Sequence, residues 1–191
     1  MDFDLNFSQN VAVKKGDLLV AEPFLKDPNF ERSVILICEH TDEEGSFGLI
    51  LNKQSLVSVE QVTDQLQLNS PLYVGGPVEQ NTLYYIHKFK DLDGALPLKN
   101  GLYWGGSYDH LKELSTTGQV STENCRFFMG YSGWGSFQLK GELERNSWIV
   151  THANLSGLFD IDPDKLWKKV LTAMGGKYKV IANYPMEPRM N

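Results

Sequence analysis

The chain has 191 residues, of which 41% are hydrophobic and 22% are charged. This length fits one domain, and folding at this size buries roughly 70% of the surface that the unfolded chain exposes. The formal net charge of -6 argues against direct binding of nucleic acid, because phosphate groups would be repelled unless basic residues gathered on one face.

The N-terminal sequence and the cysteines indicate where the protein resides. The first ten residues are acidic where a secretory signal is basic, and no apolar run approaches the roughly 18 residues of a membrane span. Cys38 and Cys125 lie in separate apolar runs without a C-x-x-C pair, so we expect both to be reduced and unpaired. These features predict a cytoplasmic protein without membrane contact.

The first part of the chain reads as a polar leader, residues 1–15, followed by strands. The first apolar run ends before Pro23. The next run is continuously apolar, as expected for a strand that is covered on both faces. A polar tip with Gly45 then predicts a hairpin. The strands are expected at residues 16–21, 33–39 and 47–51.

The middle of the chain contains two turns that each carry a pair of glycines. Ser58 and Gln61 form a capping-box pattern that predicts a helix near 58–67. Leu72–Gly76 and Leu102–Gly106 each read as a strand that stops at two glycines. A strand is expected at 82–87 and a helix at 108–115.

The stretch from Arg126 to Trp148 carries the most specific pattern. An apolar strand, expected at 126–131, ends at Gly130, and a glycine-rich turn follows. Ser136 is placed to cap a helix at 137–146. Because the chain would have to reverse within this turn, we expect Gly133 to be structurally irreplaceable and Ser132 to be dispensable.

The C-terminal part predicts a short strand, one well-marked helix and a tail. The strand is expected at 148–151. Asp162 caps the helix, Pro163 suits its first turn and Gly175 suits its end, which predicts a helix at 163–174. In the tail, residues 177–191, an edge strand is expected at 177–182.

The glycine-rich turn invites comparison with the nucleophile elbow, G-x-S-x-G, which presents a catalytic serine. Gly130-Tyr131-Ser132-Gly133 is followed by Trp134, where the elbow has glycine. Two interpretations of Ser132 are open: a nucleophile, or a turn serine whose hydroxyl bonds to nearby backbone.

No motif predicts a metal or a cofactor. The histidines His40, His87, His110 and His152 lack metal-ligand spacing, and no phosphate loop or dinucleotide fingerprint occurs. His40 and His87 end strands, where a histidine serves either in acid-base chemistry or as an edge residue.

A set of polar and aromatic residues around tight turns forms the candidate binding surface. Its members are Arg32, His40, Asn52, Tyr131, Ser132, Trp134, Asn146 and Trp148. The alternative for Trp134 and Trp148 is that both are core residues whose indole donors meet carbonyl oxygens.

Several ordered sequence blocks resemble the bacterial AlgH/YqgE family. GYSGWG is followed by QL, an acidic residue and NSW, and the earlier blocks DPNF, GLILNK, YVGGPV and GLYWGG occur in the family's order. The resemblance runs from about Gly16 to Met174. Two positions depart from the pattern: Gln54 where the family usually has proline, and Phe137 where its turn usually has another glycine.

The resemblance implies an α+β fold whose mixed, bifurcated sheet folds into a pseudo-barrel with about four helices around it. We expect one domain at 16–176, with 71–120 as a candidate subdomain. The family's label implies a regulator of transcription. We therefore expect a non-enzymatic binding or regulatory protein that acts through a protein partner without contacting DNA. The alternative is a small-molecule binder or hydrolase that uses the turn at 130–135.

Overall fold

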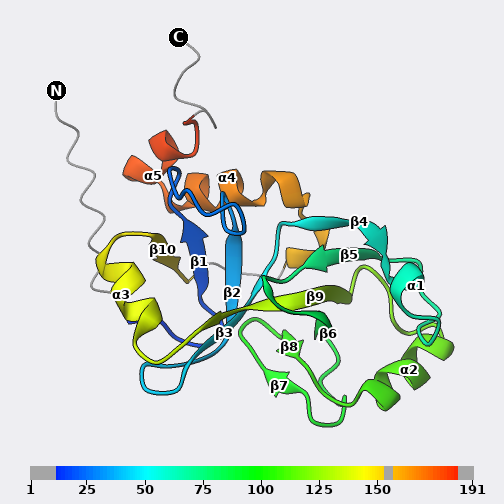
Figure 1. Ribbon diagram of the computed structural model, residues 1–191. Helices are drawn as coiled ribbons and strands as arrows, with labels where there is room; N and C mark the ends of the chain where they lie inside the picture. Colours follow the sequence, from blue (N-terminus) through cyan, green and yellow to red (C-terminus); the bar gives the residue numbers. More distant parts are fainter. Residues whose placement is uncertain (1–11, 153–156, 185–191) are drawn as a thin grey trace, which may run out of the picture.

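The computed structural model describes residues 12–152 and 157–184. The remaining parts of the predicted leader and tail lie outside these residues. Figure 1 shows a strongly twisted sheet with helices on its outside: α4 and α5 lie together along one side, α3 lies beside β10, and α1 and α2 lie at the far end. The fold is α+β, as the sequence predicted.

Ten strands and five α-helices make up the described part of the chain. The strands are β1 (Leu18–Ala21), β2 (Val34–Thr41), β3 (Gly45–Ile50), β4 (Gln54–Ser58), β5 (Pro71–Val74), β6 (Val78–His87), β7 (Leu96–Pro97), β8 (Tyr103–Trp104), β9 (Cys125–Trp134) and β10 (Trp148–Thr151). The helices are α1 (Val59–Val62), α2 (Tyr108–Thr116), α3 (Gln138–Glu144), α4 (Pro163–Met174) and α5 (Gly176–Ile181), with a 3-10 turn at Leu158–Asp160.

The sheet is mixed and branches at β9. Its main path runs β10-β1-β2-β3-β9-β6-β8-β7, and β5 leaves this path by pairing parallel to β9, with β4 beyond it. The first half of β9 therefore lies between β5 and β6, whereas its second half pairs with β3. The sheet is bifurcated, as expected, and it remains open rather than closing into a barrel.

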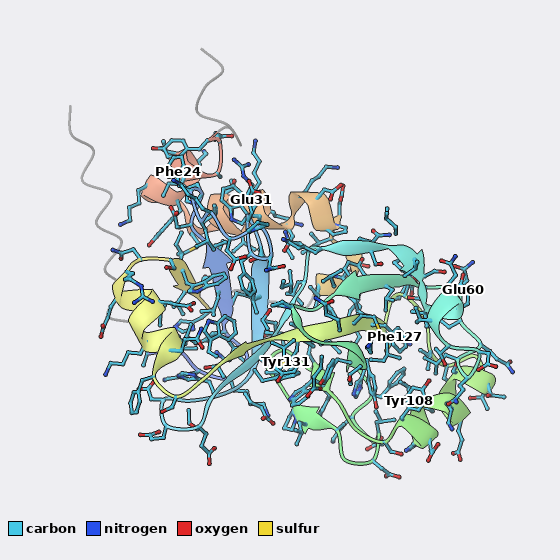
Figure 2. All side chains as sticks on the ribbon, in the orientation of Figure 1. Phe24, Glu31, Glu60, Tyr108, Phe127 and Tyr131 are labelled. Atoms are coloured by element: carbon cyan, nitrogen blue, oxygen red, sulfur yellow. The ribbon has the colours of Figure 1, made fainter. Side chains whose placement is uncertain are left out.

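The core fills both faces of the sheet because its central strands are apolar on both faces. One cluster of buried side chains lies between the sheet and α4, and includes Phe128 and Trp167. A second gathers Trp134 and Trp148 under α3, and a third packs Phe127 against α2. Figure 2 places Phe127 and Tyr131 at two points along β9, with Tyr131 near the centre of the molecule.

The predicted turn at residues 130–135 is wrong, because β9 continues as a strand to Trp134. Pairing with β3 and with Val78 of β6 keeps this glycine-rich segment extended. Helix α3 begins after Phe137, which has a left-handed φ of 56°, and Ser136 does not cap it. Gly133 does not have a positive φ; the left-handed glycine of β9 is Gly130, with a φ of 69°.

Local signals predicted some elements well and others poorly. The bounds of α4 and β10 are as predicted, and the Asp162 side chain accepts a hydrogen bond from the Asp164 backbone N–H. The capping box of α1 is present, but this helix ends at Val62. The predicted edge strand at 177–182 is wrong, because these residues form most of α5, which packs against α4. Strand β4 was not predicted.

Neither cysteine forms a disulfide, as predicted, and both are buried. Burial raises the pKa of both thiols well above the ordinary range. Among the described residues, no helix is both long and apolar enough to cross a membrane.

Candidate functional site

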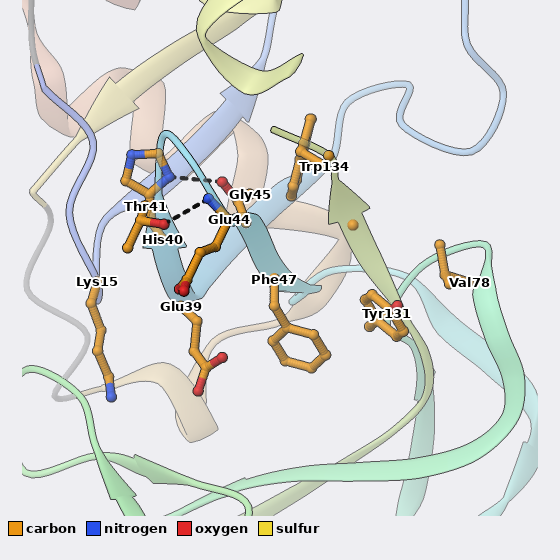
Figure 3. A pocket seen from close by; sticks show the side chains of 13 residues that line it. Lys15, Glu39, His40, Thr41, Glu44, Gly45, Phe47, Val78, Tyr131 and Trp134 are labelled. Atoms are coloured by element: carbon orange, nitrogen blue, oxygen red, sulfur yellow. Dashed lines mark hydrogen bonds between the residues drawn. The ribbon is translucent and has the colours of Figure 1, made fainter. Parts of the chain in front are cut away.

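A groove of about 740 Å³ lies between the β2–β3 hairpin and the end of β9. The hairpin contributes His40, Ser46 and Phe47, and β9 contributes Tyr131 and Trp134. Antiparallel pairing of β3 with β9 brings these segments together although they are far apart in sequence. Figure 3 shows the groove, with the rings of Phe47 and Tyr131 facing its interior.

Phe47 is the centre of an aromatic cluster behind the groove. Its ring lies 4.7 Å from that of Tyr131, 4.7 Å from that of Trp104 and 5.3 Å from that of Tyr84, measured between centroids. Such offset and tilted pairs are favourable beyond the area that they bury. The cluster therefore gives one side of the groove an apolar wall.

The opposite part of the groove is polar and carries charges of both signs. His40 Nδ1 lies 2.7 Å from Ser46 Oγ, and His40 Nε2 lies 3.7 Å from Asp42 Oδ1. Lys15, Glu39 and Glu44 also line the groove. The β2–β3 register sets His40 directly opposite Ser46, which explains how these two side chains meet.

Ser132 is fully buried, and its hydroxyl donates a hydrogen bond to the Gly75 carbonyl at 3.0 Å. Its neighbours in β9 alternate in exposure, and Ser132 lies on the inward side. A nucleophile must reach its substrate, so this geometry supports the interpretation that the hydroxyl bonds to backbone. The acceptor directly follows β5 and is 57 residues away in sequence, rather than nearby.

Trp134 and Trp148 are both buried, at 6% and 4% exposure. Their indole nitrogens donate to the same carboxylate oxygen, Glu142 Oε2, at 2.9 and 2.8 Å. Both tryptophans are therefore core residues, which was the alternative to a binding role. Their acceptor is a carboxylate on α3 and not the expected carbonyl oxygen. Only Trp134 also lines the groove.

Arg32 and Asn52 lie together, away from the groove. The Asn52 amide accepts from the Val34 N–H at 2.8 Å and donates to the Arg32 carbonyl at 2.9 Å. The Arg32 guanidinium lies 4.7 Å from the Trp167 ring centroid and donates to the Tyr184 carbonyl at 2.6 Å. These contacts hold the loop before β2 and the end of the described chain.

Asn146 follows α3 with a left-handed φ of 57°, where it ends the helix before β10. Of the predicted surface, only His40, Tyr131 and Trp134 come together in one groove. Sequence reasoning missed Phe47, Ser46 and Lys15. The hairpin pattern predicts Phe47 in a strand, but no sequence signal indicates that β3 would pair with β9.

No group of three or more histidine, cysteine, aspartate or glutamate side chains in the described ranges is arranged to hold a metal ion. The chemical features of the groove are its aromatic surface, the histidine–serine pair and charged side chains of both signs.

Comparisons with known proteins agree with this fold. A family model described as AlgH-like matches residues 18–179. A UPF0301 protein of Cytophaga hutchinsonii is 46% identical over 93% of this chain and 98% of its own length, and one of Bacteroides thetaiotaomicron is 41% identical over 96% and 94%.

Two solved structures are also similar. A crystal structure of a protein from Corynebacterium diphtheriae has a TM-score of 0.76 and 25% identity, and covers 92% of this chain and 95% of its own. The solution structure of the AlgH protein from Pseudomonas aeruginosa has a TM-score of 0.70 and 26% identity, with 90% and 94% covered. The family match and the close relatives show that the chain belongs to the AlgH-like family.

Proposed function

We propose that this is a non-enzymatic binding protein that acts through a protein partner, and that it holds a segment of that partner in the hairpin groove. The observation that carries this proposal is the aromatic wall of Phe47 and Tyr131 in an open groove of about 740 Å³. Aromatic side chains dominate the energetics of protein recognition, and a groove of this kind can take an apolar side chain of a partner.

The charges around the groove favour a polypeptide over a polyanion. Lys15 faces the same space as Glu39 and Glu44, so both a carboxylate and a cationic side chain of a partner would find an opposite charge. With a net charge of -6, we expect any effect on transcription to pass through the partner rather than through direct contact with DNA. We also propose that the protein acts in the cytoplasm.

Glu44 and Glu43 provide a matched test, because both are exposed on the hairpin but only Glu44 lines the groove. A displayed peptide library should be selected on the purified chain, and cell extract should be captured in parallel. We expect Glu44→Arg to lose the selected peptides and a captured protein that Glu43→Arg and the unchanged chain retain. Equal retention by both variants, or no selective binder for the unchanged chain, would refute the proposal.

The geometry favours one alternative function, acyl hydrolysis, at a different serine from the one that the sequence suggested. Ser46 Oγ, His40 and Asp42 lie in the order of nucleophile, base and orienting acid, with the first two within hydrogen-bond distance. All three are on the hairpin, and Ser46 and His40 line the groove. Cross-strand pairing alone also produces such a contact, so the arrangement requires a chemical test.

A fluorophosphonate probe distinguishes these functions because it labels only activated serines. If Ser46 is a nucleophile, the folded chain will be labelled, Ser46→Ala will lose the label and Ser132→Ala will keep it. An unlabelled chain would exclude this alternative and leave the binding proposal standing. Labelling lost in Ser132→Ala instead would show that the buried hydroxyl becomes accessible.

A further inference from the structure

A second cavity, of about 550 Å³, lies beside β6 and β8, where the segment after α1 approaches the start of α2. It shares the aromatic cluster with the hairpin groove: Phe47 lines the groove, and Trp104, which stacks on Phe47 at 4.7 Å, lines this cavity. The size is within the roughly 300 to 1,000 Å³ that is usual for small-molecule sites.

The walls of this cavity are aromatic and uncharged. Tyr84, Tyr85, Trp104 and Tyr108 contribute rings, and no charged side chain of the described residues lines the space, although 22% of the chain is charged. An ion entering the cavity would lose hydration without meeting an opposite charge, which is costly. Flat apolar rings, by contrast, can stack against these walls.

Two side-chain amides and the buried indole N–H of Trp104 are the polar side-chain groups of this cavity that have no hydrogen-bond partner among the described residues. The Tyr84 hydroxyl donates to Glu79 at 2.6 Å, and the Tyr85 hydroxyl donates to the Gly106 carbonyl at 2.7 Å. Gln65 and Asn81 line the cavity, and neither side-chain amide has a hydrogen-bond partner among the described residues. Each amide offers one acceptor and two donors, which complements another amide-like edge.

We propose that this cavity binds an uncharged, planar heteroaromatic molecule with an amide-like edge. Its ring packs against the aromatic walls, and the side chains of Gln65 and Asn81 bond to its polar edge. The proposal is independent of the hairpin groove, so a partner protein and this small molecule can be sought separately.

Three neutral probes, nicotinamide, benzamide and uracil, represent this class, and nicotinate and benzoate are matched anions of the first two. We expect at least one neutral probe at millimolar concentration to shift the backbone NMR signals of Leu83 and Trp104 saturably. The anions should produce no saturable shift at the same concentration. No response to any neutral probe, or an equal response to the matched anion, overturns the proposal.

Variants locate the site. Asn81→Trp should fill the cavity and abolish the shifts, whereas Gln80→Trp places the same ring on the next exposed residue, outside the lining, and should leave them unchanged. Gln65→Trp against Gln67→Trp repeats the comparison on a second segment, should the first pair fail to fold. Shifts that survive both filling variants, or that disappear equally in the folded controls, refute the assignment.

Discussion

Trp134 and Trp148 share one acceptor, because both indole N–H groups point at Glu142 Oε2. Their rings meet edge to face, with centroids 6.0 Å apart and planes 80° apart. Trp134 ends β9, Trp148 begins β10, and Glu142 lies on α3. A single carboxylate thus ties the helix to two strands of the sheet.

Replacing Glu142 by alanine should destabilise the fold. The change leaves two buried indole donors without a partner, at about 1 to 3 kcal/mol for each donor that stays unsatisfied. Glu142→Gln retains an acceptor oxygen and should lose less. Urea denaturation measures both, and Glu144→Ala, exposed on the same helix, is the control. The shared acceptor would be unimportant if the Glu142→Ala and Glu144→Ala variants unfolded at the same midpoint.

Gly130→Ala should damage the fold more than Gly133→Ala. Gly130 has a left-handed φ of 69°, and an added Cβ would lie 2.6 Å from the Gly76 carbonyl oxygen. Left-handed backbone costs a non-glycine residue about 1 to 2 kcal/mol before this clash is counted. At Gly133 the nearest atom, at 2.8 Å, is the movable ring edge of Tyr131. Thermal melts should therefore place Gly130→Ala lower, and the reverse order would contradict this account.

Phe137→Gly should stabilise the protein. Phe137 has a left-handed φ of 56°, and the residue is 54% exposed, so the ring is only partly buried while the backbone is strained. Removing Cβ should recover about 1 kcal/mol. Phe137→Ala is the control, because it removes the ring but keeps Cβ. A higher melting temperature only for the glycine variant supports the explanation, whereas equal melting of both variants assigns the effect to the ring.

His87 should make stability fall in acid. The side chain is fully buried, and burial lowers its pKa from the ordinary value of 6.5. Its Nδ1 accepts from the Phe89 N–H at 3.1 Å and its Nε2 donates to the Gly105 carbonyl at 2.9 Å, which fits the neutral ring. Below about pH 6.5 the unfolded chain binds more protons than the folded chain, so the free energy of unfolding decreases as the pH falls.

The measurement is the urea midpoint between pH 7.5 and pH 5.5. The decrease should be smaller in His87→Gln, which removes the titrating group, and unchanged in His110→Gln, whose histidine is partly exposed. If both variants kept the full decrease, His87 would not be its source.

The sequence predicted elements whose signals are local. Asp162, Pro163 and Gly175 mark both ends of α4 without help from other segments. By contrast, glycines 130, 133 and 135 suggested a turn, although pairing with β3 and β6 makes most of this stretch a strand. Residues 177–182 likewise alternate as a strand would. In the structure most of them form the helix α5, which packs against α4. Long-range contacts decide both cases.

The candidate site was harder to predict than the fold. Residue type alone grouped eight positions, yet Arg32 and Asn52 brace a loop, and Trp148 lies in the core. Which face of a strand a residue occupies follows from register, and register follows from pairing between distant segments. His40 and Tyr131 could therefore be proposed from sequence, whereas Phe47, which packs against Tyr131 and lines the same groove, could not.

The position of β9 has a consequence for how the molecule unfolds. Three branches of the sheet, which begin at β3, β5 and β6, end on this one strand, so β9 loses all of its pairing only when every branch has separated from it. Amide protons along the middle of β9 should exchange with solvent only through global unfolding. Their exchange should therefore report one common free energy of opening. A fragment of residues 71–120 would contain β5 and β6 but not the strand that joins them, and we expect it to stay unfolded alone.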